Sequence, residues 1–290
     1  CRSPEIRNLP FVVRAEYTQM VGGSGVCAVR PAPPGATRDA SNAGEFAAGV
    51  RRVLGVDPEV VSGAEEARLS FSGATAELGR PEPAATGPGG SAGTSGAVGP
   101  EPPFLVVDIG GGSTEFVVGR PGAARDLAAL SVDIGCVRLT ERHLRDDPPR
   151  PEQIEAARAD IDAALARVAA TVPAATARTL VGLAGSVTTL TAVALNLAAY
   201  DPARIHHAWI SAEQVREVTG RLLRLDHAGR AAIAVIHSGR VDVIGAGALI
   251  LDRILDTFGF DGLVTSEHDI LDGIAWSLVT GAATGSSARP

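Results

Sequence analysis

The spacing of apolar and polar residues along the chain predicts strands mixed with helices. Largely apolar runs at 104–108, 114–118 and 129–134 predict strands, the first of them buried on both faces. Apolar residues three and four positions apart predict an amphipathic helix over 151–170. Its inner face carries Ile154, Ile161, Leu165 and Val168. Strands interspersed with helices indicate the α/β class.

Further helices are predicted from their end signals. Asn42 can cap a helix with Glu45 three residues on, and Gly55 follows where a left-handed stop is expected. The face between them carries Phe46, Val50, Val53 and Leu54. Ser211 and Gln214 form the pattern of a capping box for a helix through Leu223. Other predicted elements are a short strand at 57–63, a helix at 64–74, a strand–turn–helix over 179–197, and helices at 240–257 and 269–280.

A tract rich in proline, glycine, alanine and serine separates two parts of the chain. Residues 75–103 contain almost nothing to bury, which is typical of a flexible linker or surface insertion. We therefore expect a first domain over 1–99 that ends in this tract, and a second over 104–280. Residues 281–290 are expected to form a disordered tail.

Composition narrows the class of ligand. The net charge of −7 argues against nucleic-acid and membrane-surface binding, and no apolar run is long enough to span a membrane. The chain contains no lysine, so any cationic anion clamp must use arginine. Cys1, Cys27 and Cys136 have no zinc or disulfide spacing, and no signal peptide opens the chain. The expected setting is the cytoplasm.

The stretch "VVDIGGGSTEFVVG" predicts an anion-binding turn between two strands. Asp108 ends the first strand, and Gly110, Gly111 and Gly112 can adopt positive φ angles that aim successive N–H groups into one concavity. Ser113 and Thr114 add hydroxyl donors. A divalent cation could bridge Asp108 and a phosphate. A P-loop or Rossmann turn would open a helix instead, and the alternative is an ordinary glycine-rich hairpin.

Three other patterns are weaker on their own. Gly185 and Ser186 precede a helix whose N-terminal amides could hold a second anion, or they simply make a tight turn. Glu65 and Glu66 begin a helix; one can face a cleft and deprotonate water, although paired glutamates usually form a solvated face. The His206–His207 pair and the other histidines match no metal-ligand spacing and favour surface or packing roles.

Taken in chain order, these stretches resemble the exopolyphosphatase and guanosine pentaphosphate phosphohydrolase family. The match runs from about residue 36 to 280. It includes "ATRDASNAGEF", "EVVSGAEEARLSF", "LVVDIGGGSTEFVVG", "TLVGLAGSVTTLTAVALNL", "DPARIHHAWIS", "GRVDVIGAGALIL" and "EHDILDGIAWSL". The resemblance implies the actin/Hsp70/sugar-kinase fold, an α/β architecture of two ribonuclease-H-like domains that close on a phosphorylated ligand.

The resemblance also implies roles for particular residues. Glu66 is the implied catalytic base, with Asp108 and Arg38 as further catalytic residues. Asp108 and Glu115 are the implied ligands of Mg²⁺ or Mn²⁺. The implied phosphate-binding residues are Gly110, Gly111, Gly112, Ser113, Thr114, Glu115, Gly185, Ser186 and Asn42. The implied reaction is hydrolysis of a terminal phosphoanhydride of polyphosphate or guanosine pentaphosphate, and the resemblance allows a homodimer.

One family motif has no counterpart in the sequence. The family carries an Asp-x-Gly-Thr-Asn-Ser run in the first strand of its first domain, and residues 1–35 contain none. We therefore expect an incomplete first domain and low activity. Two alternative functions remain: a phosphate or nucleotide sensor without turnover, and a kinase or ATPase of the same superfamily.

Overall fold

The structure is a computed structural model, and it describes residues 43–59, 61–78, 99–123 and 126–285. Arg38, Asn42, Cys1 and Cys27 lie outside the described residues. The chain divides into two compact units, one formed by residues 1–69 with 274–290 and the other by residues 70–273. The boundary between the units lies between Leu69 and Ser70, and the expected domains over 1–99 and 104–280 stay a prediction.

The second unit is built on a six-stranded mixed sheet of order β3-β2-β1-β4-β6-β5. Three predicted strands are present as β1 (Phe104–Ile109), β2 (Thr114–Gly119) and β3 (Ala128–Val132), and they form an antiparallel meander. β4 (Thr179–Leu183) lies parallel to β1, and β6 (Gly262–Thr265) lies parallel to β4. β5 (Trp209–Ser211) completes the edge.

Alternate residues of β1 point to opposite faces of the sheet. Leu105, Val107 and Ile109 point into the main hydrophobic core and are almost fully buried. Asp108 alternates with these residues and is therefore directed to the opposite face. It lies directly across from Glu115 in the β1–β2 register, so both carboxylates share that face.

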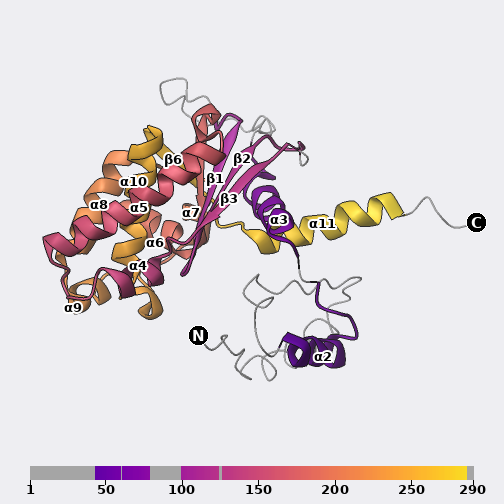
Figure 1. Cartoon of the computed structure of the whole chain (residues 1–290), viewed down its shortest axis with the longest axis horizontal. Coiled ribbons are helices and arrows are strands. Elements are labelled where there is room, and N and C mark those ends of the chain that lie inside the picture. Colours follow the sequence, from indigo (N-terminus) through magenta and orange to yellow (C-terminus); the bar gives the residue numbers. More distant parts are fainter. Residues whose placement is uncertain (1–42, 60, 79–98, 124–125, 286–290) are drawn as a thin grey trace, which may run out of the picture. The chain divides into compact units, whose positions relative to one another are not determined.

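Helices from the second unit cover the core face of the sheet (Figure 1). They are α5 (Pro151–Thr171), α6 (Ala184–Ala194), α8 (Ala212–Arg224) and α10 (Ile244–Phe258). Ile161, Leu165 and Val168 of α5 are fully buried, as their spacing predicts. The remaining helices of this unit are α4 (Cys136–Arg142), α7 (Pro202–Ile205) and α9 (His227–Ala231), with short 3₁₀ turns at Ala174–Thr176 and Ser238–Arg240.

Local end signals in the sequence are confirmed where the structure describes them. Ser211 and Gln214 form the predicted capping box, with the Gln214 N–H donating to Ser211 Oγ and the Ser211 N–H to Gln214 Oε1. Gly55 ends α2 (Ala43–Leu54) with a φ of +71°. α10 begins later than predicted, because residues 238–240 form a 3₁₀ turn first.

The described residues of 57–63 form no strand, so the predicted short strand at this place is wrong. Pro58 removes a backbone donor and α3 (Gly63–Thr75) begins a few residues later, which leaves too little chain for pairing.

α11 (Ile270–Gly285) is the last helix among the described residues. No helix in the described ranges combines the length and apolar character needed to cross a bilayer.

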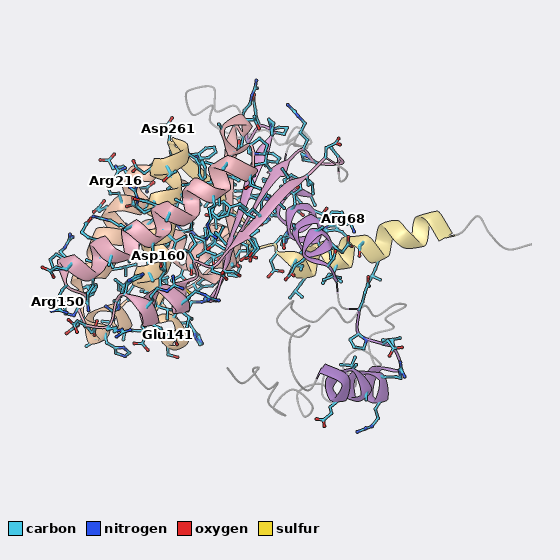
Figure 2. The ribbon with its side chains drawn as sticks, viewed as in Figure 1. Arg68, Glu141, Arg150, Asp160, Arg216 and Asp261 are labelled. Carbon is cyan, nitrogen blue, oxygen red and sulfur yellow. The ribbon has the colours of Figure 1, made fainter. Side chains whose placement is uncertain are left out.

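Charged residues cover the outer surface of the helices, including Arg150, Asp160 and Arg216 (Figure 2). One arginine is an exception. Arg230 is 7% exposed and donates hydrogen bonds to the carbonyls of Val241 and Leu225 and to the Asp147 carboxylate, at 2.8, 2.6 and 2.7 Å. A planar guanidinium can serve three acceptors at once, and an ammonium group cannot match this geometry.

We predict that Arg230→Lys lowers the free energy of unfolding of this unit by about 2–3 kcal/mol, because buried carbonyls lose their donors. Urea unfolding followed by circular dichroism measures the change. The matched control is Arg178→Lys, which alters the exposed Arg178–Glu101 pair and should cost under about 0.5 kcal/mol. Equal losses in both variants would contradict the structural role of Arg230.

The Arg230–Asp147 ion pair also makes the free energy of unfolding depend on pH. Partial burial acts to raise the pKa of Asp147, but hydrogen bonds from Arg230 and from the His227 N–H outweigh it and leave the pKa below its ordinary value. The pair therefore stabilises the fold above the unfolded pKa of about 3.9, and this stabilisation disappears as the pH falls through the lowered folded pKa. The difference in free energy of unfolding between the wild type and Arg230→Lys should therefore become smaller as the pH falls through this range. Urea unfolding repeated at several acid pH values measures it.

Candidate functional site

The glycine loop is a hairpin turn, as predicted, joining β1 to β2 through residues 110–113. Its conformation differs from the prediction. None of the three glycines lies in the left-handed region, and the only glycines with positive φ among the described residues are Gly55, Gly122 and Gly259. The loop is therefore shaped by contacts from outside it rather than by left-handed backbone angles.

Those contacts come from the first turn of α4. The Gly110 carbonyl accepts a hydrogen bond from the Cys136 N–H at 3.0 Å, and the Gly111 carbonyl accepts from the N–H groups of Val137 and Arg138 at 2.9 and 3.0 Å. The Arg138 guanidinium donates to the Gly112 carbonyl at 2.7 Å. These bonds turn the loop carbonyls toward α4.

The opposite side of the loop presents donors. Within the described chain, the N–H groups of Gly111, Gly112 and Ser113 have no hydrogen-bond acceptor, whereas the Gly110 N–H donates to the Ser113 carbonyl. Gly111 and Gly112 are exposed, so a ligand can reach these amides. Successive unpaired N–H groups form a site for an oxyanion.

Thr114 has a supporting role that differs from the predicted one. Its side chain is fully buried and its hydroxyl donates to the Ile134 carbonyl, which is part of the chain leading into α4. The proton is thus committed to a protein acceptor rather than to a phosphate. Ser113 is half-buried in the loop itself, and its role in phosphate binding stays a prediction.

Two carboxylates lie beside the loop. Asp108 and Glu115 are direct cross-strand partners, and such like-charged pairs are unfavourable unless a cation or donor compensates them. Glu115 accepts a hydrogen bond from Ser131 Oγ at 2.6 Å. The pair forms an all-oxygen donor set, which suits a hard divalent cation such as Mg²⁺.

The second predicted anion turn lies at the same edge of the sheet. Asp108 pairs with Leu183 in the parallel β1–β4 register, so both strands end side by side. α6 begins at once with Ala184, a non-glycine residue held at a φ of +69°. Gly185 follows it at the helix N-terminus. The Ser186 side chain is buried against Gly247, so only its backbone is placed for an anion.

Sequence reasoning missed Arg240, which lies directly over Gly185. A Cβ at Gly185 would be 2.1 Å from the Arg240 guanidinium, so only glycine permits this approach. The guanidinium has a 3.5 Å contact with Thr189 Oγ1, and no carboxylate of the described residues pairs with it. The absence of lysine required any cationic anion clamp to use arginine, and the resemblance implied Arg38 but not Arg240.

Glu66 lies in α3 within the first unit, and the glycine loop lies in the second. The neighbouring Glu65 binds Arg68 at 2.8 Å, one turn along the same helix. The functions of Glu66, Arg38 and Asn42 stay predictions.

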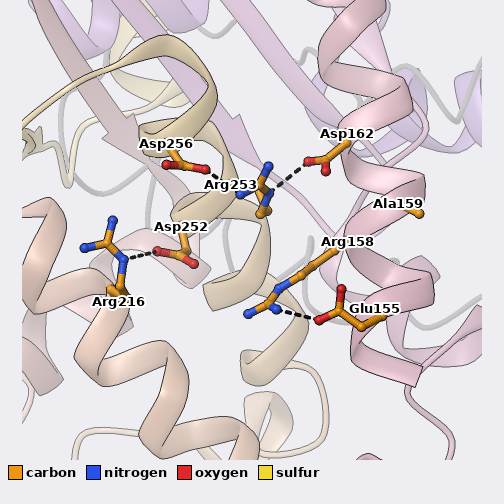
Figure 3. Close-up of a pocket in the computed structure, with 8 residues that line it drawn as sticks. All are labelled: Glu155, Arg158, Ala159, Asp162, Arg216, Asp252, Arg253 and Asp256. Carbon is orange, nitrogen blue, oxygen red and sulfur yellow. Dashed lines mark hydrogen bonds and ion pairs between the residues drawn. The ribbon is translucent and has the colours of Figure 1, made fainter. Parts of the chain in front are cut away.

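A charged cavity of about 530 Å³ lies apart from the glycine loop, between α5, α8 and α10 (Figure 3). Here every guanidinium already has an acid partner. Arg253 binds Asp162 and Asp256, Arg158 binds Glu155, and Arg216 lies 4.0 Å from Asp252. Burial raises the pKa of Asp252. Because its charges compensate one another, this cavity braces the helices and is a poor site for a phosphate.

The class of protein follows from the fold and from comparisons with solved structures. An exopolyphosphatase-like protein superposes with a TM-score of 0.80 at 38% identity, covering 94% of this chain and 84% of the other. The Ppx/GppA protein of Aquifex aeolicus superposes with a TM-score of 0.78 at 26% identity, covering 96% and 84%. The protein therefore has the actin/Hsp70/sugar-kinase fold predicted for it.

The chain belongs to the Ppx/GppA phosphatase family, whose model matches residues 15–85 and 90–281. This match begins before residue 36, the start of the resemblance described from the sequence motifs. Exopolyphosphatase 2 of Mycobacterium tuberculosis is 44% identical over 259 residues, covering 86% of this chain and 74% of the relative. The guanosine-5'-triphosphate,3'-diphosphate pyrophosphatase of Aeromonas hydrophila is 27% identical, covering 83% and 43%. As a family, these phosphatases are metal-dependent.

The hydrogen bonds between α4 and the glycine loop depend on Gly135, the residue immediately before α4. A Cβ there would lie 2.3 Å from the Gly111 carbonyl oxygen and 2.4 Å from its carbon. We predict that Gly135→Ala forces the loop away from α4. Hydrogen–deuterium exchange should then be at least about tenfold faster at Cys136, Val137 and Arg138, whose amides lose their acceptors.

The control is Gly220→Ala on α8, where the added Cβ meets only the flexible end of Arg224 at 3.2 Å. Exchange in α4 should not change in this variant. If hydrogen–deuterium exchange in α4 is unchanged in Gly135→Ala, the loop does not depend on Gly135 for its contact with α4.

Proposed function

We propose that this protein hydrolyses the terminal phosphoanhydride bond of inorganic polyphosphate, with guanosine pentaphosphate as a second substrate. The observation that carries the proposal is the row of unpaired N–H groups at 111–113 beside the opposed Asp108 and Glu115. The names and identities of the relatives support polyphosphate ahead of guanosine pentaphosphate.

The residues divide the work by charge. The loop amides would hold the oxygens of the terminal phosphoryl group, and Arg240 would meet the neighbouring phosphate beside Gly185. Asp108 and Glu115 would hold Mg²⁺ or Mn²⁺, which would neutralise charge on the phosphoryl group. Arg38 and Asn42 would add contacts from the first domain.

Glu66 would take a proton from the attacking water. The water oxygen forms a bond to the terminal phosphorus while the bridging anhydride bond breaks, and the shortened chain leaves with the bridging oxygen. Fixed donors contribute most where charge develops, and one such donor is worth about 3 kcal/mol of barrier. No covalent intermediate with the protein is needed.

The adjacent glutamates of α3 provide a matched test. Glu66→Gln should lower kcat for phosphate release from polyphosphate by about 100- to 10,000-fold, because the general base is lost. Glu65→Gln weakens the ion pair with Arg68 and should change kcat by less than about threefold. Equal activity in the two variants would reject Glu66 as the base.

Polyphosphate binding, measured by fluorescence polarisation, separates the alternatives. Binding that persists in Glu66→Gln supports a catalytic role for that residue. Tight binding by the wild type without any phosphate release would favour the sensor function. Phosphate transfer to an added small molecule, in place of release, would favour a kinase.

A second prediction concerns Arg240. Arg240→Ala should raise KM for polyphosphate by about tenfold or more, because a charge-assisted contact to phosphate is lost. Arg178→Ala, which removes an exposed arginine engaged with Glu101, is the control and should leave KM unchanged. An unchanged KM in Arg240→Ala would remove Arg240 from the site.

A further inference from the structure

A cluster of metal-ligating side chains lies in the second unit, outside the glycine-loop site. Glu77, His206 and His268 bring one ligand atom each within 4.8 Å of one another, and it is the only such group among the described residues. The three come from separate segments: the chain just beyond α3, the residue after α7, and the loop between β6 and α11. Their positions in the sequence gave no indication of a shared site.

Close backbone packing brings these segments together. Gly73 of α3 approaches Asp269 so closely that a Cβ would lie 1.9 Å from its carbonyl oxygen, which fixes the end of α3 against the loop that carries His268. The His207 N–H donates to the Thr265 carbonyl at 2.7 Å and holds the His206 segment to the end of β6. The His206 ring stacks on that of His207, at a centroid distance of 3.8 Å, and lies tilted against that of His268, at 4.2 Å.

We propose that Glu77, His206 and His268 bind one divalent transition-metal ion, with Zn²⁺ the best match. Two imidazoles and one carboxylate form a donor set that Zn²⁺ accepts, with a fourth position left for water. Imidazole ligands favour zinc, cobalt and nickel over Mg²⁺, which prefers oxygen alone. The cluster is therefore chemically distinct from the Asp108–Glu115 pair.

The separations suit one ion after a small adjustment. Glu77 Oε2 lies 3.2 Å from His206 Nε2 and 3.9 Å from His268 Nδ1. Ligands of a tetrahedral zinc site lie about 3.4 Å apart, given bonds of about 2.1 Å. The Glu77 and His268 side chains are 43% and 34% exposed, so an ion can enter and the side chains can move by the distance required.

One hydrogen bond must change when the ion binds. His206 Nδ1 accepts the Glu267 N–H at 3.1 Å, which leaves the ring proton on Nε2, facing Glu77. Metal binding at Nε2 moves that proton to Nδ1, where it opposes the Glu267 N–H. The turn at Glu267 must then shift, and Glu267 also accepts a hydrogen bond from the Tyr200 hydroxyl at 2.6 Å.

The experiment uses the full chain and needs no substrate, so its outcome is independent of the proposed hydrolysis. Zn²⁺ is titrated against a chromophoric chelator in excess Mg²⁺, and Co²⁺ replaces it for visible spectroscopy. One ion per chain is expected, with the intense Co²⁺ bands of four-coordinate nitrogen and oxygen ligation. His268→Ala and Glu77→Gln should each weaken Zn²⁺ binding by about 100-fold or more, since loss of an outer-shell partner alone costs 10- to 100-fold.

Two variants serve as controls. His227→Ala removes a histidine that lies 2.7 Å from a single carboxylate, Asp242, and should leave Zn²⁺ affinity unchanged. Asp108→Asn should also leave it unchanged, because that residue belongs to the other site. Hydrogen–deuterium exchange at Glu267 should accelerate on Zn²⁺ addition in the wild type and not in His268→Ala.

Three results would overturn the proposal. They are the absence of Zn²⁺ binding in the wild type, equal affinity in His268→Ala and wild type, and loss of binding in Asp108→Asn. The first would identify the cluster as a hydrogen-bonded stack with a packing role. Circular dichroism of each variant establishes that it is folded.

Discussion

The architecture of the glycine-loop site depends on one interaction, the contact between the loop and the first turn of α4. The loop carbonyls accept hydrogen bonds from the amides of Cys136, Val137 and Arg138, and this engagement is possible only because Gly135 has no Cβ. Once the carbonyls are held, the amides of the loop must face the other way. The direction in which these amides point is therefore a consequence of how a neighbouring helix packs, rather than of three glycines in sequence.

Charge compensation distinguishes the two polar regions of the second unit. Each arginine that lines the cavity of Figure 3 already has an acidic partner, so no guanidinium there is left for a phosphate. At the sheet edge, the unpaired amides and Arg240 lack protein acceptors of opposite charge among the described residues, while Asp108 and Glu115 face each other. The Asp108–Glu115 pair offers oxygen ligands alone, whereas the Glu77–His206–His268 cluster also offers imidazole nitrogens, for which we propose a different metal.

Features encoded within a few residues of the chain were predictable. The Ser211–Gln214 capping box, the Gly55 stop and the β1–β2 hairpin each rest on contacts between near neighbours, so local pattern sufficed. Predictions failed where longer-range packing competed. The 57–63 segment has strand-like residues but no neighbouring strand among the described residues. The loop glycines keep ordinary φ angles because hydrogen bonds from α4 hold the loop in place. α4 has only seven residues, so the apolar periodicity that would predict a helix is too short to recognise.

The sequence by itself determined the buried strands, the hairpin, the amphipathic helices and the specific run from Asp108 to Glu115, since all of these arise from periodicity and adjacency. Only the tertiary structure decided which amides remain without acceptors, that Arg240 covers Gly185, and that Thr114 serves Ile134. It also decided that Glu77, His206 and His268 meet. The physical reason is that these contacts join residues far apart in the chain, and their distances are fixed by strand order and helix packing, which no short stretch of sequence contains.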